Sequence, residues 1–208
     1  MTRHRPYRSL YRAAPEVCGN LDRPGLAIDD PLWVDHTRDE TTVDQARIEE
    51  ALEALGVSGR DLLHVGVGNS GFARRFVSRA KRIDGLTVSV AEKALADSLG
   101  IANYTVYLLN KHGRDFPATI RRRYHFIVNN NLANFAYCQY HFYRMLDNYL
   151  GCLAPGGRIL TDQRGMDFTV EDDPRWKLTF DDLAALEASF PLAASRVTDT
   201  VYALTRSR

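Results

Sequence analysis

The sequence predicts one α/β domain built on a doubly wound, mostly parallel β-sheet. Three observations predict it: strand-like and helix-like segments alternate, a glycine-rich turn follows the first strand, and the chain ends in a segment suited to a hairpin. Alternation of this kind is typical of parallel sheets that carry helices on both faces.

The first half of the domain is expected to alternate three helices with three strands. Apolar residues at helical spacing define the helices, and short apolar or β-branched runs define the strands. In chain order we expect a helix over 41–56, a strand over 62–65, a helix through 72–80, a strand over 85–88, a helix over 89–100 and a strand over 104–109. Ser89 followed by Glu92 predicts a capping box at the start of the third helix.

The second half continues the alternation. The compact apolar run YHFIV is of the kind buried in a parallel sheet. We expect a strand over 124–128, a helix over 132–150, a Pro-Gly-Gly turn and a strand within 153–162, a helix over 181–190 and a closing hairpin over 194–206.

Composition and charge exclude several classes of protein. The chain has 208 residues, 45% hydrophobic and 25% charged, with a formal net charge of +1, which gives no global attraction to nucleic acid. No apolar run is long enough to cross a membrane. Cys18, Cys138 and Cys152 are odd in number and not in C-x-x-C spacing, so we expect free thiols in a reducing compartment. The expected location is the cytoplasm.

Residues 1–40 are expected to form an arm before the domain of residues 41–208. The arm begins with several arginines and no acidic residue until Glu16, and no apolar signal region follows. Two interpretations stay open: a basic, partly flexible terminus, or a lid in which Tyr7, Tyr11 and Trp33 fold over a pocket. In the second, Tyr11 binds the substrate.

The order of these parts resembles the class I S-adenosylmethionine-dependent methyltransferase family. Four stretches carry the resemblance: HVGVGNSG (64–71), GLTVS (85–89), FIVNNNL (126–132) and LAPGGRIL (153–160). The Pro-Gly-Gly segment before the fifth strand and the closing hairpin are both common in this family. The resemblance implies a Rossmann-like, seven-stranded sheet in the order 3-2-1-4-5-7-6, and S-adenosylmethionine as cofactor.

The expected cofactor site lies at the carboxyl ends of the strands, where open parallel sheets bind ligands. The resemblance places the glycine loop against the methionine part of the cofactor, Thr87 near the ribose, Asn110 near the adenine and Asn129 beside the sulfonium. The full set of expected cofactor-binding residues is Gly66, Val67, Gly68, Asn69, Ser70, Gly71, Thr87, Val88, Ser89, Asn110, Asn129 and Asn130.

Three positions depart from the pattern of the family. His64, Thr87 and Asn110 stand where acidic residues are common at the first three strands. A neutral side chain binds ribose hydroxyls more weakly than a carboxylate does. Glu92, one helical turn from Thr87, is a candidate substitute, although the capping box is its better-supported role.

Candidates for chemistry cluster after the fourth and fifth strands. Asn129, His141 and Asp162 are the expected catalytic residues, with His141 as a general base. Tyr137, Tyr140, His141 and Arg144 share one helix face, which either lines a substrate pocket or faces solvent. The expected substrate-binding residues are Asn131, Tyr137, Tyr140, Arg164 and Tyr11. No cluster has metal-ligand spacing, so no metal is expected.

The predicted function is an S-adenosylmethionine-dependent transferase that methylates an oxygen or nitrogen of a small molecule. One alternative is a methyltransferase-fold protein that uses the cofactor for another reaction or serves as a binding partner. A second is an NADP-dependent reductase, because G-x-G-x-x-G also fits a dinucleotide fingerprint. The expected partner is a small molecule, not nucleic acid or a membrane, and a homodimer is left open.

Overall fold

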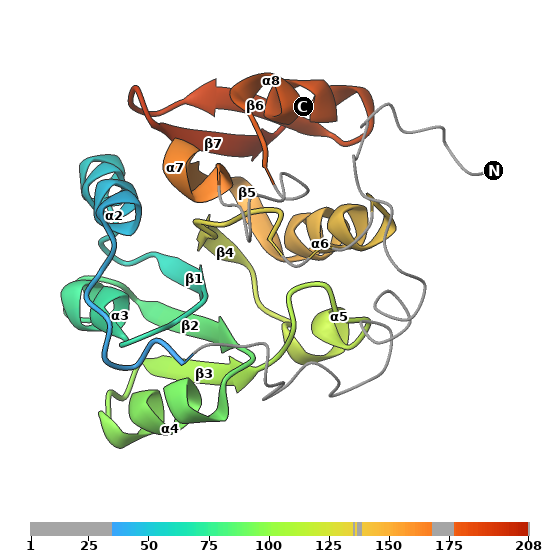
Figure 1. The fold of residues 1–208 in the computed structure, drawn as a ribbon. Helices are drawn as coiled ribbons and strands as arrows, with labels where there is room; N and C mark the ends of the chain where they lie inside the picture. Colours follow the sequence, from blue (N-terminus) through green and yellow to red (C-terminus); the bar gives the residue numbers. More distant parts are fainter. Residues whose placement is uncertain (1–34, 135, 137–138, 168–176, 208) are drawn as a thin grey trace.

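One mixed sheet organises the molecule (Figure 1). The computed structural model describes residues 35–134, 136, 139–167 and 177–207. The strands are β1 (Asp61–Val65), β2 (Arg82–Thr87), β3 (Tyr104–Leu108), β4 (Tyr124–Val128), β5 (Leu153–Asp162), β6 (Leu192–Arg196) and β7 (Val201–Arg206). Their order is β3-β2-β1-β4-β5-β7-β6, as predicted. Strands β1 to β5 run parallel and β7 lies antiparallel between β5 and β6, which confirms the closing hairpin.

Helices cover both faces of this sheet (Figure 1). They are α2 (Val43–Leu55), α3 (Gly71–Phe76), α4 (Val90–Ser98), α5 (Phe116–Thr119), α6 (Gln139–Cys152), α7 (Gln163–Met166) and α8 (Phe180–Ala185), which a 3₁₀ turn (Leu186–Ala188) extends. Successive strand residues point to opposite faces. Leu62 therefore packs with residues of α2 and α3, whereas Leu63 packs with residues of α5, α6 and α8. The doubly wound arrangement predicted from the alternation of elements is confirmed.

The Pro-Gly-Gly segment, expected as a turn before the fifth strand, instead lies inside β5. The pairing of β4 with β5 shifts register between Tyr124 and Phe126. Gly156 has a φ of 69°, and a Cβ on Gly157 would lie 2.9 Å from the carbonyl oxygens of Ala154 and Tyr124. These glycines form a bulge that no larger residue fits. The prediction of a turn was wrong because glycine is typical both of turns and of bulges, so the sequence pattern does not distinguish the two.

Two helix boundaries also differ from those expected. Helix α3 ends at Phe76, short of Ala80, because the Asn103 side-chain amide donates to the carbonyls of Val77 and Ala80 at 3.0 and 3.1 Å. These bonds satisfy carbonyls in a non-helical turn. Helix α6 begins at Gln139, not at 132. The strand β2 begins at Arg82, ahead of the expected strand over 85–88.

Strand β2 carries a buried carboxylate in its interior. Asp84 is fully buried, its Oδ2 accepts a hydrogen bond from the Tyr124 hydroxyl at 2.6 Å, and its Oδ1 has no partner among the described residues. Burial raises the pKa of the Asp84 carboxyl, since the charged form loses its hydration. An acidic residue in a strand interior also explains why apolar patterning missed the start of β2.

The protein is expected to lose stability as pH rises through the raised pKa of Asp84, because the folded state resists ionisation that the unfolded chain allows. Asp84→Asn keeps the shape without a charge to bury, so it should remove this component of the pH dependence and be at least as stable as wild type at pH 8. Tyr124→Phe should cost about 1–3 kcal/mol, because it leaves the carboxyl without its donor. Urea unfolding from pH 4 to 8 measures both. A large loss of stability in Asp84→Asn at pH 8 contradicts this account.

Candidate functional site

Five loops that follow parallel strands meet at one edge of the sheet. They begin after Val65, Thr87, Leu108, Val128 and Asp162, the last residues of β1 to β5. Because these strands run in the same direction, the expected site segments lie at their carboxyl ends, where ligands bind in such sheets. Hydrogen bonds link the loops to one another and to the segment that precedes β1.

The glycine loop between β1 and α3 has the backbone of a ligand-binding turn. Gly66 and Gly68 have φ values of 83° and 49°, and Ser70 has a φ of 59°. Among the described residues, a Cβ on Gly66 would meet no atom within 4 Å, so these residues leave the space beside it open. The Asn69 side chain accepts from the Gly71 amide at 2.7 Å and orders the turn. Val67 is buried and packs with residues of α4 and β3.

Helix α4, which follows β2, carries a buried carboxylate in its first turn. Glu92 is 4% exposed, and its Oε2 accepts a hydrogen bond from the Thr87 hydroxyl at 2.6 Å. Ser89 accepts from the Glu92 amide at 3.3 Å and the Ser89 amide donates to Thr87 Oγ1 at 3.0 Å. Ser89 therefore caps α4 as predicted, but the Glu92 side chain turns to Thr87, not back to Ser89. Val88 is half-buried between them.

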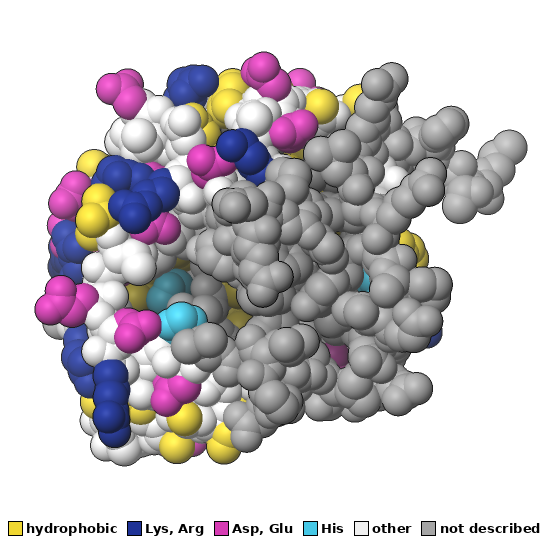
Figure 2. Space-filling model, viewed as in Figure 1, with side chains coloured by type: hydrophobic (Ala, Val, Ile, Leu, Met, Phe, Trp, Pro, Cys, Tyr) yellow, Lys and Arg dark blue, Asp and Glu magenta, His cyan; other side chains and the backbone are white. Residues whose placement is uncertain are grey.

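Residues 35–41 cross the glycine loop. The His36 amide donates to Glu92 Oε1 at 3.3 Å, and the Asn69 side chain donates to the carbonyl of Asp39 at 2.6 Å. The Cβ and carbonyl of His36 each lie 3.7 Å from the position of a Cβ on Gly68. Figure 2 shows histidine side chains at a hollow on this face of the molecule. This short segment, which sequence reasoning assigned to an arm, is thus part of the site.

The loops after β3 and β4 are tied together by a buried lysine. Lys111 Nζ donates to the carbonyls of Asn131 and Leu132 at 2.8 and 3.2 Å and to Asn134 Oδ1 at 2.5 Å. Burial lowers the pKa of Lys111 to about 7. Asn110 Oδ1 accepts from the amide of the following His112 at 2.9 Å, so it orders the β3 loop from within.

The two asparagines after β4 point to different partners. Asn129 is 2% exposed and its side chain donates to the Tyr149 hydroxyl of α6 at 2.9 Å. Asn130 donates to the carboxylate of Asp44 in α2. Asn129 is therefore buried against α6, below the carboxyl ends of the strands, whereas Asn130 lies where the loop after β4 meets α2. Asn131 is half-buried, and its carbonyl binds Lys111.

The end of β5 carries a carboxylate that is fully paired. Both oxygens of Asp162, which is fully buried, accept from Arg47 of α2 at 2.9 and 2.5 Å, and Oδ1 also accepts from the Arg164 amide at 2.8 Å. The Arg164 side chain is exposed. Asp162 thus anchors α2 and caps α7, and its role as a base stays a prediction. Asp44 and Arg47 were missed because nothing in the sequence brings α2 to this edge.

The polar face of α6 packs on the loop after β3. His141 is 1% exposed, Arg144 Nε donates to the carbonyl of His112 at 2.7 Å, and the Asn148 side chain donates to the carbonyls of Lys111 and Gly113. Tyr140, on the same face, is 58% exposed. The side chains of this face therefore hold the loop after β3 in place. Tyr137 and Tyr11 lie outside the described residues.

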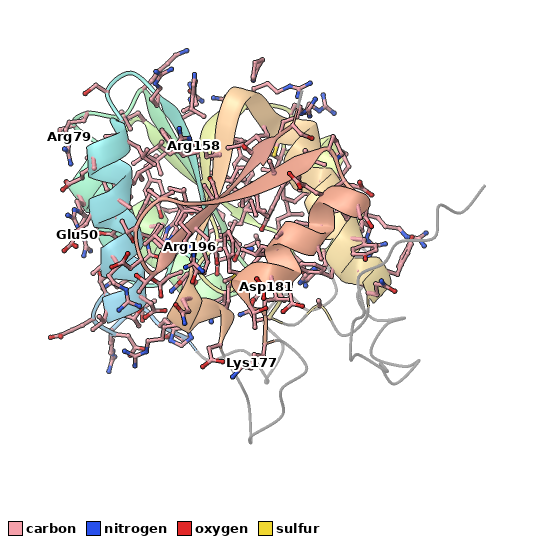
Figure 3. The ribbon with its side chains drawn as sticks, turned by 90° about the horizontal axis from the view of Figure 1, so that it is seen from above. Glu50, Arg79, Arg158, Lys177, Asp181 and Arg196 are labelled. Atoms are coloured by element: carbon pink, nitrogen blue, oxygen red, sulfur yellow. The ribbon has the colours of Figure 1, made fainter. Side chains whose placement is uncertain are left out.

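An open cleft of about 370 Å³ lies beyond the end of β5. Arg196 lies over the rings of Phe180 and Tyr202 at 4.4 and 5.0 Å, and the Tyr202 hydroxyl donates to Gln163 at 3.0 Å. Figure 3 shows Arg196, Asp181 and Lys177, which border this cleft. Its lining combines aromatic faces with paired polar groups: Gln163, Asp167, Lys177, Leu178, Thr179, Phe180, Asp181, Arg196 and Tyr202.

His64, near the end of the first strand, is part of the core. His64 is 5% exposed and stacks on Phe72 at 4.3 Å, and burial lowers its pKa to about 3. In the part of the chain that the structure describes, no group of three or more metal-ligating side chains was found, and no helix is long and apolar enough to cross a membrane.

Solved structures with the same fold were found, although no family model and no curated protein matches the sequence. The sugar N-methyltransferase KedS8 from Streptoalloteichus sp. matches with a TM-score of 0.61 at 14% identity, over 82% of this chain and 89% of its own. N-methyltransferase NodS from Bradyrhizobium japonicum, in complex with S-adenosylhomocysteine, matches with a TM-score of 0.58 at 13% identity, over 91% and 94%. The [4+2]-cyclase SpnF matches with a TM-score of 0.53 at 18% identity, over 85% and 67%. The chain has the class I methyltransferase fold.

Lys111→Met should destabilise the protein by about 1–3 kcal/mol, because buried acceptors of the β4 loop lose their donor. The lowered pKa of Lys111 also predicts a pH dependence of stability. Above pH 7 the unfolded chain keeps the lysine proton while the folded protein releases it, so the free energy of unfolding of the wild type should rise from pH 7 towards 10. The variant should lack that rise. Denaturant unfolding at pH 6, 8 and 9.5 measures both effects.

Lys93→Met is the matched control, since Lys93 pairs with Asp97 on the exposed side of α4. Such surface pairs contribute a few tenths of a kcal/mol. Equal losses in the two variants would show that Lys111 does not hold the loop.

Proposed function

We propose that this protein binds S-adenosylmethionine at the carboxyl ends of β1 to β3 and transfers its methyl group to a nitrogen or oxygen of a small molecule. The observation that carries the proposal is the buried carboxylate of Glu92, which stands beside the glycine loop in a chain of this fold. It supplies at the second strand the negative charge that Thr87 lacks.

The residues at this edge fit the cofactor. The open space beside Gly66 admits close approach of a ligand to the backbone, and Glu92 offers acceptors for the two hydroxyls of a ribose. By the resemblance, we expect Asn110 and the β3 loop to contact the adenine. The proposal is supported further by NodS, whose structure contains S-adenosylhomocysteine.

The cofactor supplies an activated methyl group on a sulfonium, so the protein has mainly to orient the acceptor. Alignment of two reactants lowers barriers by about 7–11 kcal/mol in the best intramolecular models. Here α2 and the ends of β4 and β5 form a rigid wall, through the bonds from Arg47 to Asp162 and from Asn130 to Asp44. Asn129 supports this wall, because its backbone amide donates to the Leu160 carbonyl of β5, whereas the His141 carbonyl contacts the His112 ring of the β3 loop. Direct contact of Asn129 and His141 with the reacting atoms stays a prediction.

The acceptor side suits a polar small molecule. The cleft beyond β5 offers aromatic faces and hydrogen-bonding groups at once, as Tyr202, Phe180 and Gln163 illustrate. Among the described side chains on the face in Figure 2, basic and acidic groups are interspersed. KedS8 and NodS are both N-methyltransferases, and KedS8 acts on a sugar, which favours a nitrogen acceptor and a small substrate.

A second candidate is a reaction other than methyl transfer in the same fold. The likeness to the [4+2]-cyclase SpnF favours keeping it, because that protein shares this architecture and is named for a cyclisation. In that case the chain would bind the cofactor without consuming it.

S-adenosylhomocysteine and S-adenosylmethionine should raise the melting temperature, and NADPH should not, since bound ligand stabilises the folded state by about 2.7 kcal/mol at 100 times its Kd. Glu92→Gln keeps the side chain's size but loses its charge, and should weaken S-adenosylhomocysteine binding roughly tenfold. Glu50→Gln, an exposed change on α2 (Figure 3), is the control and should bind like wild type. Calorimetric titration measures the affinities.

A shift with NADPH alone, or equal affinities in Glu92→Gln and Glu50→Gln, contradicts the proposal. Methyl transfer itself is tested by incubating the protein with the cofactor and a panel of amino sugars and small amines, and measuring S-adenosylhomocysteine formed. Cofactor binding with no turnover on nitrogen or oxygen acceptors would favour the second candidate.

A further inference from the structure

The carboxylate proposed to bind the ribose is already engaged by the protein's own backbone. Glu92 Oε2 accepts from the Thr87 hydroxyl at 2.6 Å, and its Oε1 accepts from the His36 amide at 3.3 Å. A ribose diol has two hydroxyl donors and binds best when each carboxylate oxygen accepts from one of them. Each oxygen can accept two hydrogen bonds, so the His36 amide takes one of the two acceptor positions of Oε1 and restricts how such a ligand can approach it.

His36 also occupies space at one half of the glycine loop. Its Cβ and carbonyl lie 3.7 Å from the Cβ position of Gly68, whereas no described atom lies within 4 Å of the Cβ position of Gly66. The described residues thus cover one part of the loop and leave the other open. A ligand that extends from Gly66 towards Glu92 meets the residue that covers Gly68.

The covering segment is built to be held lightly at one end. Its carboxyl end runs into α2, which is fixed by the bond from Arg47 to Asp162, and the Asp39 carbonyl binds Asn69 at 2.6 Å. Among the described residues, its other end makes local bonds besides the one from His36 to Glu92: Asp35 accepts from the Thr37 amide at 2.8 Å, and the His36 ring contacts Asp39 at 2.7 Å while both side chains are more than half exposed. Of the described contacts, release of His36 from Glu92 breaks one hydrogen bond, of 3.3 Å.

We propose that the His36 amide is a built-in competitor for the ribose-binding carboxylate of Glu92, and that cofactor binding releases the amino-terminal part of the segment, around His36, from the glycine loop. This inference rests on the proposed function. Its consequence is an order of events: His36 covers part of the site before the cofactor arrives and is free to move once the ribose has taken its place. The bond from Asn69 to the Asp39 carbonyl is kept, so the exchange at Glu92 is between one amide and a diol on the same carboxylate.

The test uses a pair of substitutions at one position. His36→Pro and His36→Ala both remove the imidazole and its contact with Asp39, but only proline lacks the N–H donor. Proline is compatible with the local turn, in which Asp35 accepts from Thr37, because Asp-Pro favours turn initiation. His36→Pro should bind S-adenosylhomocysteine roughly three- to tenfold more tightly than His36→Ala in calorimetric titration.

A measurement on the wild type makes the test independent of the variants. Hydrogen exchange and tryptic cleavage after Arg38, which is exposed, should both increase in the segment when S-adenosylhomocysteine is added. Equal affinities of the two variants, or protection of the segment by the ligand, would overturn the inference. Absence of any binding by the wild type would instead refute the proposed function, so the two failures are distinguishable.

Discussion

The pairing of Arg47 with Asp162 is the constraint on which the arrangement of the site depends. Asp162 ends β5 fully buried, and a buried carboxylate without a partner would cost several kcal/mol. Arg47 satisfies it from α2, a helix whose apolar residues Ile48 and Leu52 pack on the sheet. The ion pair and the apolar face together fix both the position and the rotation of α2. The chain that precedes the helix must then pass over the glycine loop.

The neutral residues at the first three strand ends have different physical consequences. His64 stacks in the core with its pKa lowered, so it carries no charge at neutral pH, and Asn110 orders its own loop. At the second strand the acidic group lies not on the strand but on α4, where the Glu92 carboxylate accepts from the Thr87 hydroxyl. Thr87 thus occupies the strand position where an acid is common in the family, and its hydroxyl orients the carboxylate of Glu92.

The sequence was sufficient for features that depend on local patterns and insufficient for those set by tertiary contacts. The glycine loop, the strand ends and the closing hairpin follow from turn chemistry and from hydrophobic alternation, and all three were predicted. The direction of the Glu92 side chain was not, because a serine three residues earlier favours a capping box on local grounds. The bond from the Thr87 hydroxyl and the tertiary bond from the His36 amide, 56 positions away, overrode it. The same holds for Lys111, whose three acceptors lie twenty or more positions away in sequence.

The carboxylates at this edge share a property that bears on specificity. Asp162 is bound by Arg47, Asp44 by Asn130, and Glu92 by Thr87 and His36. A ligand that approaches any of them must exchange a protein hydrogen bond for its own, so only a donor of matching geometry is favoured. The exchange costs differ: the pairs at Asp162 and Asp44 hold α2 in place, whereas the bond to His36 holds only a short segment. A ligand with two adjacent hydroxyls is therefore expected to enter at Glu92, the one of the three where an exchange leaves the helix and the sheet intact.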